Sequence, residues 1–168
     1  NEYYNTALVN YYNKKGDRKS AIAVYEKMLE TAQSKSDVYM SLYNLYSEEN
    51  DHVKALEVLN ALERIEGKSL RISLDKHMQY VQSNDLENAV SLVQQLIQEN
   101  PDDVSFYFLL GETYVLFGKY AEAEGFYEYF HRHTFHNLNG DRLKLLIIFD
   151  QFEEIFTLQD DAQKKKTF

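Results

Sequence analysis

The chain has 168 residues, of which 18 are basic and 27 acidic, with a formal net charge of −9, no cysteine and one proline. This composition excludes disulfides and thiolate metal sites, and the acidic balance argues against a nucleic-acid partner, which a basic face would hold by its phosphates. No apolar run approaches the roughly 20 residues of a transmembrane helix, and so few prolines and glycines are typical of a helical protein.

The chain opens at Asn1, with neither an initiating methionine nor a signal peptide. We therefore expect a mature product or a fragment excised from a longer protein. The composition leaves the compartment open between the cytoplasm and the periplasm, because the absence of cysteine is compatible with both.

Two kinds of side chain recur every 34 residues along most of the chain. The recurring tyrosines are Tyr12, Tyr46, Tyr80 and Tyr114, and alanines follow nine residues after each, at Ala21, Ala55, Ala89 and Ala123. The dipeptides between them are Gly16-Asp17, Asn50-Asp51, Asn84-Asp85 and Gly118-Lys119. Because Gly and Asn accept a positive φ and Asp caps helices, each dipeptide predicts a tight turn between two helices.

The third block shows the expected pair of helices, Leu70 to Gln82 and Asp85 to Gln98. The second of them carries an apolar stripe at helical spacing, formed by Leu86, Ala89, Val90, Val93, Leu96 and Ile97. The small alanine is expected where two helices cross closely. Since one hairpin cannot bury its own apolar face, neighbouring hairpins must stack into a superhelix.

These columns resemble the signature of the tetratricopeptide repeat family, which has the same period. The fourth block matches it best, with Tyr107, Leu110, Gly111, Tyr114, Ala123, Tyr127 and Phe130 at the family's spacings. In the first three blocks the usual small residue before the tyrosine is replaced by Val9, Tyr43 and His77. The resemblance implies an all-α fold: a right-handed α-solenoid of four hairpins over residues 2–132, with repeats at about 2–35, 36–69, 70–103 and 104–132.

In that family the first helices of the hairpins line a concave groove that binds peptides. The resemblance therefore implies a groove formed by Asn10, Asn44, Arg71, Leu74, Met78, Val81, Phe108, Glu112 and Val115. The amides of Asn10 and Asn44 could hold the backbone of an extended peptide. The apolar second half of the groove suits an amphipathic helix or an apolar peptide, unless a further helix of the same protein covers it.

Family members that grip the C-terminal carboxylate of heat-shock chaperones use two lysines and an arginine. Only Arg71 is available here, because Thr6 and Asp75 stand where basic residues would be expected. We therefore do not expect this chain to be a carboxylate clamp.

No catalytic motif emerges from the sequence. The stretch from Ile65 to Ser69 ends like a P-loop, but Leu62 occupies the position of that motif's first glycine, so Gly67 is expected to end a helix and Ser69 to cap the next. His131 and His133 cannot share one helix face, and the sequence supplies no third ligand. We predict no enzymatic activity, cofactor or metal.

The C-terminal segment, residues 133–168, breaks the repeat, because Ile148 and Thr157 stand where a fifth block would need Tyr and Ala. Interpreted as a helix, the segment would cap the last repeat with an apolar stripe of Leu145, Ile148, Phe149, Phe152, Ile155 and Phe156.

Interpreted as a strand, residues 145–149 resemble the Walker B segment of STAND-type signalling ATPases. That resemblance implies that Asp150 holds Mg²⁺ and that Glu153 or Glu154 orients the attacking water. No P-loop accompanies the segment, so the chain by itself should not hydrolyse ATP.

Two functions follow from these alternatives. The first is a non-catalytic scaffold that binds a protein or peptide in the groove, and the second is a fragment of a STAND-type signalling ATPase whose repeats sense a ligand. The sequence does not identify the partner or the oligomeric state. Its tyrosine-rich repeats look bacterial.

Overall fold

The computed structural model describes residues 2–31 and 34–127, and its regular structure there is entirely helical. Seven helices follow one another along the chain: α1 (Glu2–Lys15), α2 (Arg18–Met28), α3 (Lys35–Glu48), α4 (His52–Glu66), α5 (Leu70–Gln82), α6 (Leu86–Glu99) and α7 (Val104–Leu116). A further helical stretch covers residues 120–127. The described part contains no strand, so the predicted all-α fold is confirmed.

The C-terminal segment lies outside the described residues, and with it both the capping-helix and the strand interpretation. The same holds for the histidine pair and for Asp150, Glu153 and Glu154 of the Walker B alternative. The division of the chain into a repeat region, 2–132, and a C-terminal segment, 133–168, therefore stays a prediction.

The hairpins turn at the dipeptides that the sequence indicated. The first residue of each has a positive φ: 71° at Gly16, 58° at Asn50, 59° at Asn84 and 70° at Gly118. In the first three turns the next residue is an aspartate whose side chain accepts a hydrogen bond of 3.1 Å from a backbone N–H three residues on: Asp17 from Ser20, Asp51 from Lys54 and Asp85 from Asn88. Ser69 likewise caps α5, accepting from the Ile72 N–H at 3.3 Å. The predicted turn and cap chemistry is confirmed.

The fourth turn has the same backbone but a lysine where the others have the capping aspartate. The Lys119 amide donates to the Tyr114 carbonyl at 2.8 Å, as the Asp51 amide does to the Tyr46 carbonyl. We expect Lys119→Asp to add the missing capping hydrogen bond and to stabilise the protein by about 1 kcal/mol. Thermal unfolding followed by circular dichroism tests this, with Lys119→Ala as the control that removes the lysine and adds no acceptor. A melting temperature for Lys119→Asp no higher than that of the control would contradict the prediction.

The recurring alanines lie where helices cross closely. Ala21, Ala55, Ala89 and Ala123 are all 0% exposed. Gly111 has a similar role, because a Cβ there would lie only 2.9 Å from Cε1 of Tyr127 in the last helical stretch. Small side chains at these points let the helix axes approach each other.

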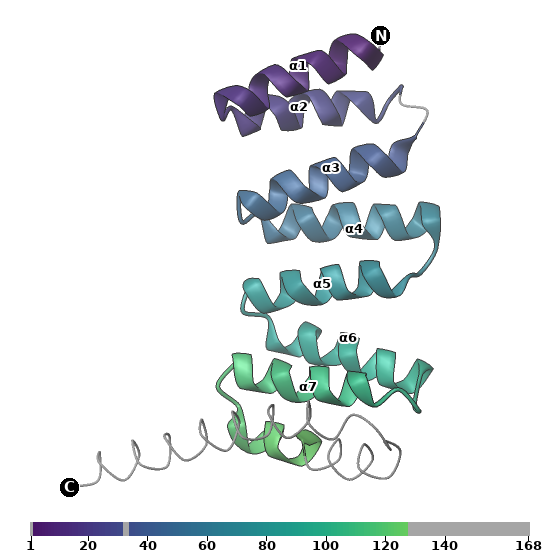
Figure 1. Cartoon of the computed structure of the whole chain (residues 1–168), viewed down its shortest axis with the longest axis vertical. Helices are drawn as coiled ribbons and strands as arrows, with labels where there is room; N and C mark the ends of the chain where they lie inside the picture. Colours follow the sequence, from purple (N-terminus) through teal and green to yellow (C-terminus); the bar gives the residue numbers. More distant parts are fainter. Residues whose placement is uncertain (1, 32–33, 128–168) are drawn as a thin grey trace, which may run out of the picture.

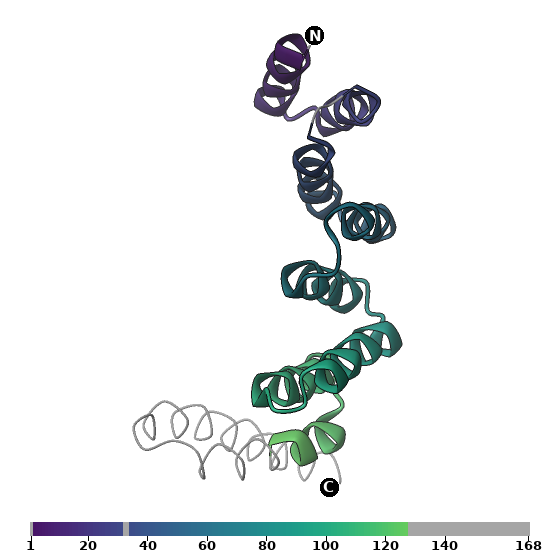
Figure 2. The same ribbon diagram turned by 90° about the vertical axis from the view of Figure 1, so that its right-hand side faces the viewer.

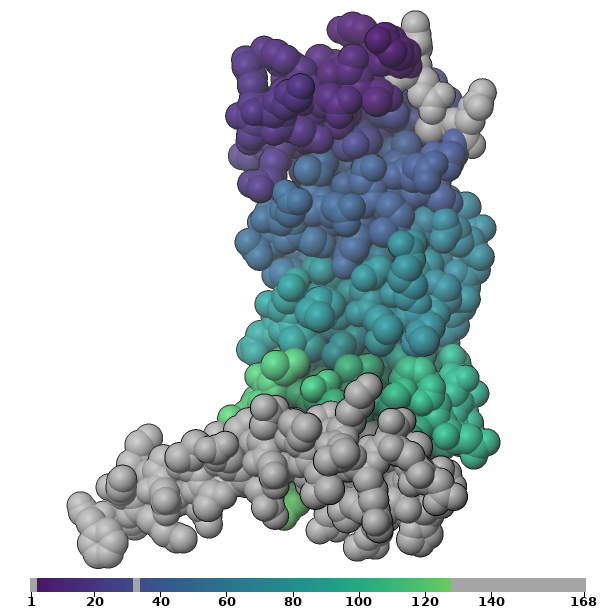
Figure 3. All heavy atoms as spheres, viewed as in Figure 1, coloured from purple at the N-terminus to yellow at the C-terminus, as the bar shows by residue number. Residues whose placement is uncertain are grey.

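The hairpins stack in chain order into an elongated column (Figures 1 and 3). Each helix packs mainly on the helices next to it in sequence, as in other repeat proteins. Figure 2 shows the first helices of the hairpins, α1, α3, α5 and α7, along one side of the stack, with the second helices behind them. That side curves inward between α1 and α7.

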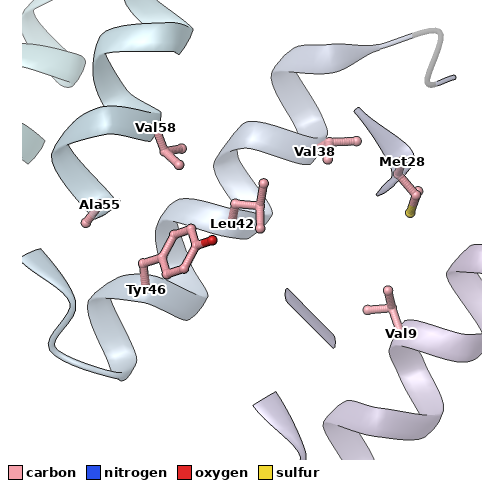
Figure 4. Packing of buried hydrophobic residues seen from close by; sticks show 7 residues of the cluster. All are labelled: Val9, Met28, Val38, Leu42, Tyr46, Ala55 and Val58. Atoms are coloured by element: carbon pink, nitrogen blue, oxygen red, sulfur yellow. The ribbon is translucent and has the colours of Figure 1, made fainter. Parts of the chain in front are cut away.

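Apolar side chains join the first repeat to the second and the second to the third. One buried cluster links α1 to α4 and consists of Val9, Met28, Val38, Leu42, Tyr46, Ala55 and Val58 (Figure 4). A smaller cluster of Leu59, Leu62 and Ile72 joins α4 to α5. Burial of these side chains supplies the main stabilising term, since no hairpin can bury its apolar face alone.

Polar side chains occupy much of the buried face of α5. They are Ser73, Lys76, His77 and Gln79. The Gln79 amide donates to the Ser47 hydroxyl of α3 at 3.0 Å, and its oxygen lies 2.9 Å from Nδ1 of His52 in α4. Lys76 pairs with Glu63 of α4 at 2.8 Å. The third repeat therefore contacts the second through hydrogen bonds as well as apolar packing.

His77 connects α5 to α7 in the same way, because its Nε2 lies 2.8 Å from the buried Thr113 hydroxyl. That hydroxyl donates its own hydrogen to the Leu109 carbonyl at 2.7 Å, so it accepts from Nε2–H of His77. Burial lowers the pKa of His77 and favours the neutral ring. An imidazole fits where the family usually has a small residue because it finds its partner in the next repeat.

Candidate functional site: the face of the first helices

The nine residues inferred for the groove all lie on the first helices of the hairpins. Asn10 is on α1 and Asn44 on α3, and the others divide between α5 (Arg71, Leu74, Met78 and Val81) and α7 (Phe108, Glu112 and Val115). All nine are exposed or half-buried, and none belongs to the core. The structure thus brings them to the side of the stack that curves inward in Figure 2, which we call the first-helix face. Their part in binding stays a prediction.

One column of this face changes its chemistry from repeat to repeat. Asn10, Asn44, Met78 and Glu112 are 34 residues apart and so occupy the same position of successive first helices. The column runs from two amides through a thioether to a carboxylate. A segment bound along the stack would meet these groups in that order.

Exposed apolar side chains mark the third repeat. Leu74 is 39% exposed and Met78 50%, and they lie one turn apart on α5. On α7, Phe108 and Val115 are half-buried, and the Phe108 ring lies 5.7 Å from the Tyr127 ring. Large apolar side chains exposed next to each other are typical of an interaction surface.

Arg71 is engaged by groups of its own chain. Its Nη2 lies 3.3 Å from the Met40 sulfur, and its charge acts on the Asp75 carboxyl. Burial raises the pKa of Asp75, although Arg71 and a hydrogen bond from the Tyr43 hydroxyl both oppose the increase. The positive charge of Arg71 is therefore largely balanced within the face.

Glu112 has no such balance. It is half-buried on α7, and burial raises the pKa of its carboxyl. No basic side chain of the described residues opposes that increase. The carboxylate form has lost part of its hydration without gaining a cation.

Metal and membrane sites were also considered for the described residues. No group of three histidine, aspartate or glutamate side chains among them could hold a metal ion. None of the helices between residues 2 and 127 is long and apolar enough to cross a membrane.

Stacked hairpins with a 34-residue period, closed by small residues and capped at each turn, define the class of helical-repeat solenoids. Within that class, residues 6–39 and residues 80–128 match the sequence pattern of the tetratricopeptide repeat. The chain therefore contains tetratricopeptide repeats, as the sequence analysis predicted. A search of the curated proteins found no match.

Solved structures with the same fold include MamA and another tetratricopeptide repeat protein. A crystal structure of MamA is 20% identical in sequence, with a TM-score of 0.54 over 77% of this chain and 71% of the MamA chain. MamA from Desulfovibrio magneticus RS-1 is 16% identical, with a TM-score of 0.53 over 78% of this chain and 74% of its own. A tetratricopeptide repeat protein from Parabacteroides merdae is 19% identical, with a TM-score of 0.52 over 74% of this chain and 49% of its own. At these identities the likeness concerns the fold.

Proposed function

We propose that this chain is a non-catalytic scaffold that binds a peptide or protein segment on its first-helix face. Tetratricopeptide repeats in general serve protein–protein interaction and are not enzymes, which supports a protein partner. The stack holds its helices rigidly against one another, so the face is formed before the partner arrives.

The observation that carries the proposal is the exposure of Leu74 and Met78 side by side on α5. A soluble surface gains nothing from two adjacent large apolar side chains, whereas a partner that covers them removes their apolar area from water. The flexible thioether of Met78 can adapt to different partner side chains. The exposed amides of Asn10 and Asn44 extend the same face towards α1 with groups that can pair with a peptide backbone.

The charges of the face argue against recognition of a free carboxylate. Arg71 already contacts Met40 and is balanced by Asp75. The residues of the ATPase alternative lie outside the described part, and neither family match supports it.

A peptide selection tests the proposal directly. Peptides of about 16 residues would be selected from a random display library on the immobilised chain, and their dissociation constants measured by fluorescence polarisation. We expect the double variant Leu74→Ala with Met78→Ala to bind the selected peptides at least about tenfold more weakly, a loss of about 1.4 kcal/mol, because it removes most of the apolar contact area.

The matched control is Val53→Ala with Ile65→Ala, which truncates two exposed apolar side chains of α4, a second helix. The control should bind like the wild type, and both double variants should keep the helical circular dichroism spectrum. Selected peptides that bind the Leu74/Met78 variant as tightly as the control would show that the face is assigned wrongly. A selection that yields no peptide at all would contradict the scaffold proposal itself.

A further inference from the structure

The charge of the first-helix face points to the kind of partner it takes. Its charged side chains are Asp37, Arg71, Asp75 and Glu112, and the only base among them is already engaged by Met40 and Asp75. The charge left over is negative and lies partly at Glu112, beside the apolar side chains of α5 and α7. The whole chain carries a net charge of −9, so its longer-range field has the same sign.

Glu112 is placed where a partner's cation would have the largest effect. It is the last member of the column that begins with Asn10, Asn44 and Met78, and Phe108 and Val115 flank it at helical spacing on α7. Its carboxyl is half-buried, and burial raises its pKa with no compensating base among the described residues. A cation brought beside it would stabilise the carboxylate more strongly than it would a fully hydrated one, because the local dielectric is lower.

We infer that the first-helix face binds a segment that places an apolar side chain on Met78 and a lysine or arginine side chain on Glu112. The inference rests on the proposed function and adds the chemistry of the partner: apolar and basic, the opposite of the acidic C-terminus that a carboxylate clamp recognises. The apolar residue supplies contact area, and the basic residue selects among apolar segments, since an acidic one would meet an unbalanced carboxylate.

The peptides selected in the experiment above test this inference through their sequences and through Glu112→Gln. We expect apolar peptides in which one lysine or arginine recurs. The tightest of them would be compared with a copy whose basic residue is replaced by methionine, on the wild type, on Glu112→Gln and on Glu87→Gln. Glu87 is an exposed residue of α6, so its variant makes the same charge change away from the face.

On the wild type the basic peptide should bind about tenfold more tightly than its methionine copy. Glu112→Gln should abolish that preference, and Glu87→Gln should keep it. Selected peptides that lack a recurring basic residue, or a preference that survives Glu112→Gln, would overturn the inference and leave the scaffold proposal standing. A preference lost equally in both variants would assign it to net charge and likewise overturn the role of Glu112. Failure to select any peptide would refute the scaffold proposal, and this inference with it.

Discussion

Replacing Leu59 with alanine is expected to lower the free energy of unfolding by about 2 to 5 kcal/mol. Leu59 is 0% exposed and belongs to the buried cluster that joins α4 to α5, where Tyr39, Met40 and Tyr43 of α3 also pack. The substitution removes apolar contacts and leaves a cavity between the second and third repeats. Because each repeat depends on its neighbours for burial, we expect both halves of the stack to lose stability.

Urea unfolding followed by circular dichroism measures this effect. Ile65→Ala is the matched control, because it truncates a 50% exposed side chain of the same helix and should change stability by less than about 0.5 kcal/mol. If the two variants unfold at the same urea concentration, the junction between the second and third repeats is not held by this cluster.

Thr113→Val should cost about 1 to 3 kcal/mol although it barely changes the volume of the side chain. The valine cannot accept the hydrogen bond from Nε2–H of His77, which would then lie buried without an acceptor. Thr113 is 0% exposed and His77 only 5%, so water cannot easily replace the lost hydroxyl. Thr113→Ser, which keeps the hydroxyl, should lose clearly less.

A double-mutant cycle with His77→Leu separates this hydrogen bond from the other effects of the substitution. In the His77→Leu background no donor is left unpaired, so Thr113→Val should cost at least about 1 kcal/mol less than in the wild type. Equal costs in the two backgrounds would mean that the contact between α5 and α7 does not depend on this pair.

The repeat itself could be predicted from the sequence because its causes are local. A positive φ at Gly16 or Asn50 and an aspartate cap at Asp51 are properties of single residues and their near neighbours. The alanine column could be predicted as well, since only a small side chain suits a close crossing and the period shows where crossings recur. The buried alanines and the capped turns confirm these predictions.

The polar contacts between repeats could not be predicted in this way. His77 and Thr113 are 36 residues apart, as are Tyr43 and Gln79, whose amide lies 3.5 Å from the Tyr43 hydroxyl. A register of 34 residues plus two therefore joins each of these first helices to the next. The sequence shows His77 only as a departure from the usual small residue, and its partner becomes visible once the helices are placed side by side.

The first-helix face divides along the same line. That Asn10, Asn44, Met78 and Glu112 belong to one column follows from their common position in the period, so the sequence alone determines the order of chemical groups along the stack. Only the tertiary structure decides that Arg71 is engaged while Glu112 is not, because hydration and ion pairing depend on which helices pack around a group. Periodicity specifies which residues share a face, and packing between repeats specifies which of them are left available to a partner.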